Sequence, residues 1–261
     1  MDFKNGGVGI NMTNNQKKIH AWEPNSFKLE TNSIWNFPER GDWATHDSKY
    51  RGNWSPYIPR NVLLRYSNEN DWVLDQFVGG GTTLVEAKLL NRNAVGVDVN
   101  DLAIMRCHEK CDFEQENTRK VVIKKGDARN LDFLPNDTID LICTHPPYAN
   151  IIKYSMDIKN DISLCAVDEY LKQMVRVAEE SFRVLKQNKF CVVLMGDMRW
   201  QGYVYPLGFK IMNIFESVGF KIKEIIIKQQ HNCQATEYWA NKAIKQNFLL
   251  LAHEYLFVFK K

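Results

Sequence analysis

The chain has 261 residues, of which 44% are hydrophobic and 25% charged, and this suits one large soluble domain or two small ones. No apolar run reaches the roughly 18 residues that a membrane span needs, and the first residues lack a signal-peptide core, so we expect a cytoplasmic protein without membrane contact. The six cysteines form no CxxC pair, which argues against a metal site, and the net charge of +3 permits an acidic partner without requiring one.

The sequence divides into a polar arm and one larger unit. Residues 1–50 are rich in asparagine and carry isolated tryptophans, and we interpret them as an irregular N-terminal arm. In residues 51–261, short apolar runs alternate with segments of helical period, without an internal repeat or an evident linker. We therefore treat residues 51–261 as a single domain.

Predicted strands and helices alternate along this domain. The strand candidates are Trp72–Leu74, Ala94–Val97, Val121–Lys124, Ile139–Cys143, Cys191–Met195, Ile222–Ile227 and Phe248–Phe259. The helix candidates are Thr82–Leu90, Asn100–Cys111, Val167–Leu185 and Leu207–Val218. Several strand candidates are continuous Val/Ile/Leu runs, as expected of strands covered on both faces. The alternation predicts an α/β fold with a doubly wound, mainly parallel seven-stranded sheet and an antiparallel edge strand.

A glycine loop follows the first strand candidate. The segment VLDQFVGGGTT, residues 73–83, runs from a strand through Asp75 and three glycines into a helix start. Glycines allow a tight turn and close ligand approach, and the amino end of a helix offers free N–H groups. A dinucleotide or ATP site is disfavoured, because Leu84 stands where GxGxxG needs glycine and no lysine follows the glycines. A purely structural turn remains an alternative.

Two further strand candidates also end near an acid. Asp98 lies in AVGVDVN, and Asp127 follows the apolar run in VVIKKGDARNL. Alone, each aspartate is explained by helix capping or by a turn. Ligands of open α/β sheets bind beyond the carboxyl ends of the strands, so three acids in succession predict a site for ribose hydroxyls and an amine.

The fourth strand candidate ends in LICTHPPY, where two prolines and a tyrosine follow the apolar run. With LDQFVGGGTTLVEA, GVDVN and GDARNL, in chain order, it resembles the S-adenosylmethionine-dependent DNA methyltransferases that modify cytosine N4 or adenine N6. The resemblance covers residues 50–261. It implies a Rossmann-like class I methyltransferase fold, with residues 51–261 as the catalytic domain.

The resemblance implies S-adenosylmethionine as the cofactor. The loop 79–82 would wrap its methionine part above Asp75, Asp98 would hold the ribose hydroxyls, and Asp127 would hold the adenine amine. The segment from Ser55 to Tyr57 is a weaker candidate, because a proline-punctuated loop leading into a helix explains it equally well. The cofactor-binding candidates are Tyr57, Asp75, Phe77, Gly79, Gly81, Thr82, Asp98, Asp127 and Ala128.

The catalytic candidates are His145, Pro146, Pro147 and Tyr148. An aromatic amine is a poor nucleophile because its lone pair is delocalised into the ring, and acceptors aimed at its N–H bonds would free that lone pair. The two prolines fix φ and hold the Pro146 carbonyl oxygen in one direction as such an acceptor. Tyr148 can stack on the target base. A mere turn is the alternative for this segment.

His145 departs from the family pattern, which has Asp, Asn or Ser at this point as a second acceptor. A neutral imidazole can accept through one ring nitrogen, whereas a protonated one cannot. Two interpretations stay open: His145 accepts from the amine, or it only packs and leaves Pro146 to act. Thr144 is more similar to the TSPPY of cytosine-N4 enzymes than to the DPPY of adenine enzymes, which favours cytosine.

The resemblance implies double-stranded DNA as the partner, with the target base flipped out of the stack. The arm at residues 35–54 is one candidate contact, and a plain solvated surface is the alternative for every candidate. A monomer or homodimer is expected, and a cognate restriction endonuclease is a candidate partner. The other DNA-contact candidates are Lys153, Tyr154, Arg199, Gln229 and Asn232.

Two other functions stay open. N2-guanine RNA methyltransferases carry a similar (N/D)PPY site, although we see no added RNA-binding domain, which favours DNA. A protein that binds cofactor or DNA but has lost catalysis is the second alternative. It is signalled by His145 and by Gln76, where the family commonly has proline.

Overall fold

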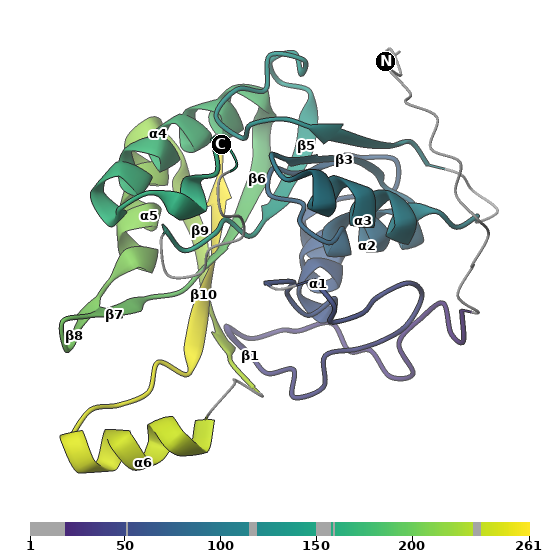
Figure 1. The fold of residues 1–261 in the computed structure, drawn as a ribbon. Coiled ribbons are helices and arrows are strands. Elements are labelled where there is room, and N and C mark those ends of the chain that lie inside the picture. The colour runs from purple at the N-terminus through teal and green to yellow at the C-terminus, as the bar shows by residue number, and fades with distance from the viewer. Residues whose placement is uncertain (1–18, 51, 115–118, 150–157, 159, 232–235) are drawn as a thin grey trace.

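The computed structural model describes residues 19–50, 52–114, 119–149, 158, 160–231 and 236–261 (Figure 1). Its central sheet has eight strands in the order β1-β9-β10-β6-β5-β2-β3-β4, and β7 and β8 form a separate hairpin. The strands are β1 (Ile34–Trp35), β2 (Trp72–Asp75), β3 (Asn93–Asp98), β4 (Val121–Lys125), β5 (Ile139–Thr144), β6 (Leu185–Met195), β7 (Met198–Trp200), β8 (Tyr203–Tyr205), β9 (Lys221–Gln229) and β10 (His253–Lys260).

Helices cover both faces of this sheet. On one face lie α1 (Tyr57–Tyr66), α2 (Thr82–Leu89) and α3 (Asp101–Cys111), and on the other lie α4 (Val167–Val184) and α5 (Leu207–Val218) (Figure 1). Alternate residues of one strand enter opposite cores: Leu74 of β2 packs with the α4 and α5 side chains, whereas Val73 packs with those of α1 and α2. The doubly wound α/β prediction is therefore confirmed.

The antiparallel strand lies inside the sheet and not at its edge. The pairs β2–β3, β2–β5, β3–β4 and β5–β6 are parallel, whereas β10 is antiparallel to both β6 and β9. The run Leu256–Phe259 is fully buried, so β10 needs a neighbour on each side and cover on both faces. The arm supplies a short eighth strand, β1, which pairs with β9 in parallel.

The four predicted helices are found within one residue of their expected ends. The amphipathic α4 shows why: Tyr170, Met174, Val177 and Ala178 recur at helical spacing, and all are buried. Two helices lie outside the prediction. These are α1 and α6 (Thr236–Gln246), and α6 lies beyond the start of β10, away from the sheet (Figure 1). Correspondingly, β10 begins at His253 and not at Phe248.

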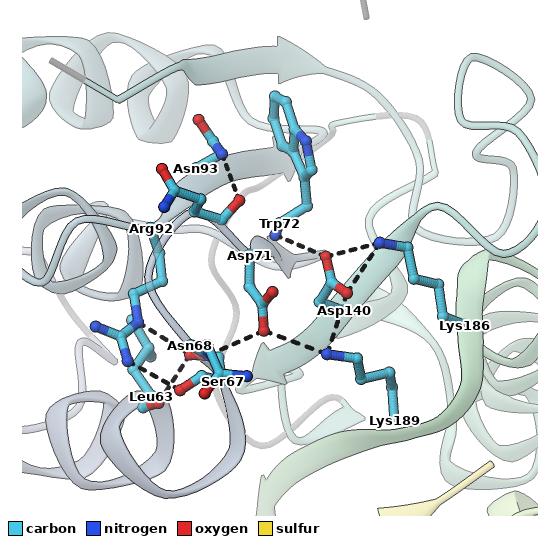
Figure 2. A network of polar contacts seen from close by, with 11 residues as sticks. Leu63, Ser67, Asn68, Asp71, Trp72, Arg92, Asn93, Asp140, Lys186 and Lys189 are labelled. Carbon is cyan, nitrogen blue, oxygen red and sulfur yellow. Dashed lines mark hydrogen bonds and ion pairs between the residues drawn. The ribbon is translucent and has the colours of Figure 1, made fainter.

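A polar network ties the sheet together at the amino ends of the strands (Figure 2). Asp140, at the start of β5, accepts hydrogen bonds from the Trp72 amide at 3.0 Å and from the Lys186 ammonium at 2.9 and 3.0 Å. It also pairs with Lys189 at 3.2 Å. Burial alone would raise the pKa of Asp140, but these donors hold it below its usual value. Strands β2, β5 and β6 are thereby joined at the end opposite the predicted site.

Among the described residues, no helix combines the length and the apolar character that crossing a bilayer requires. Within the same part of the chain, no three His, Cys, Asp or Glu side chains gather as metal ligands would.

Candidate active site

A pocket opens at the carboxyl ends of β2, β3, β4 and β5, where the sequence predicts the ligand. It brings together Asp75, Phe77, Gly79, Thr82, Asp98, Asp127, Ala128, His145 and Pro147. The remaining walls come from the end of the arm, from the 3-10 turn Ile162–Leu164 that precedes α4, and from Val177 of α4. Parts of the predicted cofactor loop and of the predicted catalytic segment therefore line one cavity, whereas Pro146, which is buried, and Tyr148 are not among its lining residues.

Asp75 lies beneath the glycine loop and organises it. Its carboxylate accepts from the Phe77 amide at 3.1 Å and from the hydroxyls of Thr83 at 2.6 Å and Thr144 at 2.8 Å. Burial raises the pKa of Asp75 to about 6, although these three donors act in the opposite direction. The cost of burying this carboxylate is thus partly offset by bonds that connect β2, α2 and β5.

Asp98 lies at the end of β3, facing the same loop. Its oxygens accept from the Gly79 amide at 3.0 Å and from the Asn100 amide at 3.0 Å. Burial raises the pKa of Asp98, while the backbone donors lower it. Each carboxylate oxygen has a second lone pair, so Asp98 retains the capacity to accept from two vicinal hydroxyls.

The predicted acceptor for the adenine amine, Asp127, is already engaged with a neighbouring cation. The guanidinium of Arg129 donates to it through Nε at 2.8 Å and through Nη2 at 2.5 Å. Asp161 lines the same pocket and lies directly before the 3-10 turn Ile162–Leu164. The sequence analysis did not single it out. Arg129 is a further lining residue, and its pairing with Asp127 sets the charge at this end of the cavity.

The end of the arm and the residues that directly follow it cover the glycine loop. Tyr50, Gly52, Asn53 and Trp54 all line the pocket. The Gly80 amide donates to Asn53 Oδ1 at 3.2 Å, and a Cβ at Gly80 would lie only 2.6 Å from Asn53 Nδ2. Glycine is therefore needed at this position for the close approach of the two segments. Asn53 and Trp54 lie just before the predicted segment 55–57 and within the segment 35–54 proposed for DNA contact, but neither was singled out for the cofactor.

Tyr57 does not line the pocket. Its ring stacks on Phe37 with centroids 5.4 Å apart and meets Trp43 edge-on at 4.8 Å, so it packs the arm against α1. This corrects its assignment to the cofactor. Gly81 also lies behind the loop: its φ is +85°, and a Cβ there would lie 2.9 Å from Cys107 Sγ on α3. Its role is to let the loop pack on α3.

A buried carboxylate of α2 holds the arm in place. Glu86 is fully buried and accepts from Trp43 Nε1 at 2.7 Å, from His46 Nε2 at 2.8 Å and from Arg60 Nη1 at 3.0 Å. A paired and hydrogen-bonded charge is the form in which a carboxylate tolerates burial. Part of the predicted irregular arm is thus built into the protein core, with Trp35 and Trp43 almost fully buried.

The catalytic segment continues from β5 over the pocket. His145 packs between two rings, with Trp54 stacked at 5.7 Å and Tyr148 edge-on at 5.5 Å. Its Nε2 lies 3.1 Å from the Tyr148 hydroxyl, which donates to Glu254 Oε1 at 2.6 Å. Burial lowers the pKa of His145 below the usual histidine value, so the ring is neutral at pH 7. Glu254 had no local signal in the sequence.

The DNA-contact candidates fall into two groups. Lys153, Tyr154 and Asn232 lie outside the described residues. Gln229 is exposed at the end of β9. Arg199 is engaged internally: it donates to the carbonyl oxygens of Gly202 at 3.2 Å and Leu249 at 2.5 Å, and its guanidinium lies over the Phe248 ring. It braces the β7–β8 hairpin, and its role as a DNA contact stays a prediction.

The pocket fits S-adenosylmethionine, a cofactor with an adenosine part and a charged methionine part. Asn53 Nδ2 is a buried donor on the pocket wall that has no hydrogen-bond partner among the described residues. A methionine carboxylate beside Gly80 would satisfy it, as buried donors require. At the other wall, Asp98 offers acceptors for ribose hydroxyls.

The comparisons with known proteins agree with this geometry. The model of the N6/N4 DNA methylase family matches residues 7–105 and 139–261. A tRNA (guanine(10)-N2)-dimethyltransferase of Pyrococcus abyssi is 24% identical over 72% of this chain and 49% of its own length. The Type II methyltransferase M.BglII of Bacillus subtilis is 29% identical over 52% of this chain and 36% of its own length. The chain thus spans at most about half the length of these relatives.

A crystal structure of a SAM-dependent methyltransferase from Methanosarcina mazei superposes with a TM-score of 0.54 at 15% identity, over 77% of this chain and 96% of that one. This likeness supports the class I methyltransferase fold. The family match covers most of the chain and includes both the glycine loop and the diproline segment. The chain therefore belongs to the N6/N4 DNA methylase family, whose cofactor is S-adenosylmethionine.

Proposed function

We propose that this protein transfers a methyl group to an exocyclic amine of a flipped base in double-stranded DNA. One observation carries the proposal: His145 and Pro147 line one pocket with the cofactor loop, and Thr144 bonds directly to Asp75 beneath that loop. The amine and the methyl donor can therefore meet at the junction of β2 and β5. Residues 51–261 would form the catalytic domain, and the arm would complete the pocket wall.

In this proposal the cofactor lies across the carboxyl ends of β2 and β3. Asp98 holds the ribose hydroxyls, the loop 79–82 and Asn53 hold the methionine part, and Asp127 with Arg129 borders the adenine. When bound, the cofactor supplies an electrophilic methyl group on a sulfonium sulfur. The protein's own task is to orient the amine towards that carbon and to exclude water.

The Pro146 carbonyl oxygen is the proposed acceptor for the target amine. Pro146 and Pro147 fix their φ angles, so this oxygen needs no reorganisation during the reaction. When this oxygen accepts a hydrogen bond from the amine N–H, the nitrogen lone pair is drawn out of conjugation. The nitrogen can then form its bond to the methyl carbon while the sulfur–carbon bond breaks. The extra proton on nitrogen leaves to water. The ring of Tyr148 provides the surface on which the flipped base stacks.

Cytosine N4 is the preferred target and adenine N6 the alternative, because THPPY is more similar to the motif of the cytosine enzymes. The Thr144 side chain itself faces Asp75, so this preference rests on motif resemblance and not on a contact to the base. The Pyrococcus tRNA enzyme among the relatives supports a second candidate, a guanine-N2 RNA methyltransferase.

DNA would approach the side of the pocket formed by the segments that follow β6 and β9 and that precede β10. Exposed aromatic and aliphatic side chains gather on the β7–β8 hairpin and around α6, including Trp200, Tyr203, Tyr238 and Trp239. Lys242 lies beside Trp239, and such aromatic and cationic pairs suit bases and phosphates. Gln229 is exposed next to this surface and remains a candidate for reading a base edge. A restriction endonuclease partner remains a candidate as well.

The decisive experiment supplies purified protein with labelled S-adenosylmethionine and either unmodified duplex DNA or tRNA, and identifies the methylated nucleoside by mass spectrometry. We expect N4-methylcytosine in DNA, and an Asp98→Ala variant should lose the signal. N6-methyladenine would reverse the base preference, and N2-methylguanine in tRNA would establish the second candidate. Cofactor binding without product on any nucleic acid would show that catalysis has been lost.

A further inference from the structure

The phenol of Tyr148 is held by a residue 106 positions away in sequence. Its hydroxyl donates to Glu254 Oε1 at 2.6 Å, which is short for a hydrogen bond and typical of a hydroxyl donating to a carboxylate. Glu254 is 6% exposed and is the second residue of β10. Glu254 does not line the cofactor pocket, so it acts on the catalytic segment and not on the cofactor.

A cation on the neighbouring strand keeps Glu254 charged. Lys228 of β9 lies opposite Glu254 in the strand register, and its ammonium is 2.9 Å from Glu254 Oε2. Burial by itself would raise the pKa of Glu254, but Lys228, His145 and the Tyr148 hydroxyl together hold it below the ordinary value. The acceptor for Tyr148 is therefore an ionised carboxylate, which makes a stronger hydrogen bond than a neutral group.

His145 completes the arrangement from the other side. Its Nε2 lies 3.1 Å from the Tyr148 hydroxyl, so this nitrogen faces the phenol. The ring also hydrogen-bonds the backbone of Gly52 and stacks on Trp54. Because Nε2 is engaged with the Tyr148 hydroxyl, it is not directed at a target amine.

We propose that Glu254, Lys228 and His145 are positioning residues that fix the Tyr148 ring as the stacking surface for the flipped base. The inference rests on the proposed function and extends it to substrate positioning. Of the two interpretations of His145, it selects the supporting role and leaves the Pro146 carbonyl as the acceptor.

The physical reason is preorganisation. A tyrosine ring held only by its backbone samples several angles, and each sampled angle that does not match the base reduces the fraction of productive encounters. A misplacement of about 1 Å can lower a rate by about a hundredfold. Fixing the hydroxyl at the far end of the ring removes this freedom, and the cofactor pocket is unaffected.

The test compares Glu254→Gln, Tyr148→Phe and the double variant with a matched control, Glu224→Gln, which removes an exposed carboxylate from β9. We expect Glu254→Gln and Tyr148→Phe each to lower kcat about tenfold, and the double variant to fall no further, because both remove the same contact. Cofactor affinity measured by calorimetry should be unchanged, and Glu224→Gln should behave as the unmodified protein. Multiplicative losses in the double variant, or full activity of Glu254→Gln, would overturn the proposal.

A second measurement does not depend on activity. In protein carrying isotope-labelled tyrosine, the NMR signals of Tyr148 should shift and broaden in Glu254→Gln and should be restored towards their original position in Glu254→Asp, which keeps the charge. Unchanged Tyr148 signals would overturn the positioning role even if no methylated product were found. Absence of product with the expected NMR changes would instead count against the proposed function alone.

Discussion

The Thr144 hydroxyl donates a 2.8 Å hydrogen bond to Asp75 Oδ1 and so joins the last residue of β5 to the last residue of β2. The two strand ends carry the catalytic segment and the cofactor loop. Both side chains are almost fully buried, with exposed fractions of 1% and 2%. This contact, together with the parallel pairing of β2 and β5, sets the distance between the two halves of the proposed reaction site.

Replacing Thr144 by valine should therefore affect both stability and rate. The substitution keeps the shape but leaves a buried carboxylate oxygen with one donor fewer, at a cost of about 1–3 kcal/mol. We expect urea unfolding to show this loss and kcat to fall. Thr144→Ser, which keeps the hydroxyl, should stay close to the original protein, and equal losses in both variants would contradict the assigned bond.

The raised pKa of Asp75 predicts a pH dependence of stability. Its pKa is about 6 in the folded protein against 3.8 for the free side chain, so between these values the folded state binds more protons than the unfolded state. Stability from this group rises as pH falls through 6. Relative to Asp75→Asn, the unmodified protein should gain about 1 kcal/mol between pH 7 and pH 5 in urea unfolding. A difference that is independent of pH would refute the shift.

His145 should titrate below pH 6.5, because burial lowers its pKa. Its folded pKa lies below the unfolded value, so the unfolded state binds more protons and stability is lost as pH falls from 6.5 towards the folded pKa. The proton signal on Cε1 of this ring, followed by NMR, measures the midpoint directly. A midpoint at or above 6.5, or an unchanged pH slope in His145→Asn, would exclude a neutral buried ring.

Glu86 should be essential for attaching the arm. Glu86→Gln removes one of the two carboxylates that pair with the buried Arg60 guanidinium, and because Glu23 remains, we expect a loss below the about 3–5 kcal/mol that breaking a buried pair completely costs. We expect this loss in urea unfolding, together with weaker cofactor binding, since the arm carries Tyr50 and Asn53 to the pocket. Glu216→Gln on the exposed face of α5 is the control and should lie within about 0.5 kcal/mol of the original.

Gly80→Ala should weaken cofactor binding about tenfold or more in calorimetry. The new methyl group would lie 2.6 Å from Asn53 Nδ2 and 3.0 Å from Tyr50 Cβ, so the covering segment has to move. Adding Asn53→Ala opens part of that space. The double variant should therefore regain part of the thermal stability that Gly80→Ala loses. Unchanged affinity in Gly80→Ala would show that this segment does not cover the cofactor.

The sequence alone determined the class of fold and the edge of the sheet where the site lies. Strands and helices follow from periodicities that are local, and Gly79–Gly81 and the two prolines constrain their own backbone wherever they stand. Since parallel strands end at one edge, the acids at three strand ends could be placed together without coordinates. The sequence alone also shows that His145 departs from the family motif, which has Asp, Asn or Ser at this position.

Only the tertiary structure decided which groups surround these residues. Tyr57 was assigned to the cofactor, yet it packs against Phe37 and Trp43 of the arm. Glu254 meets Tyr148, and Glu86 meets Trp43, across more than 40 positions of sequence. No periodicity or spacing encodes such pairs, because they arise when separate elements pack, and the position of β10 inside the sheet was decided in the same way.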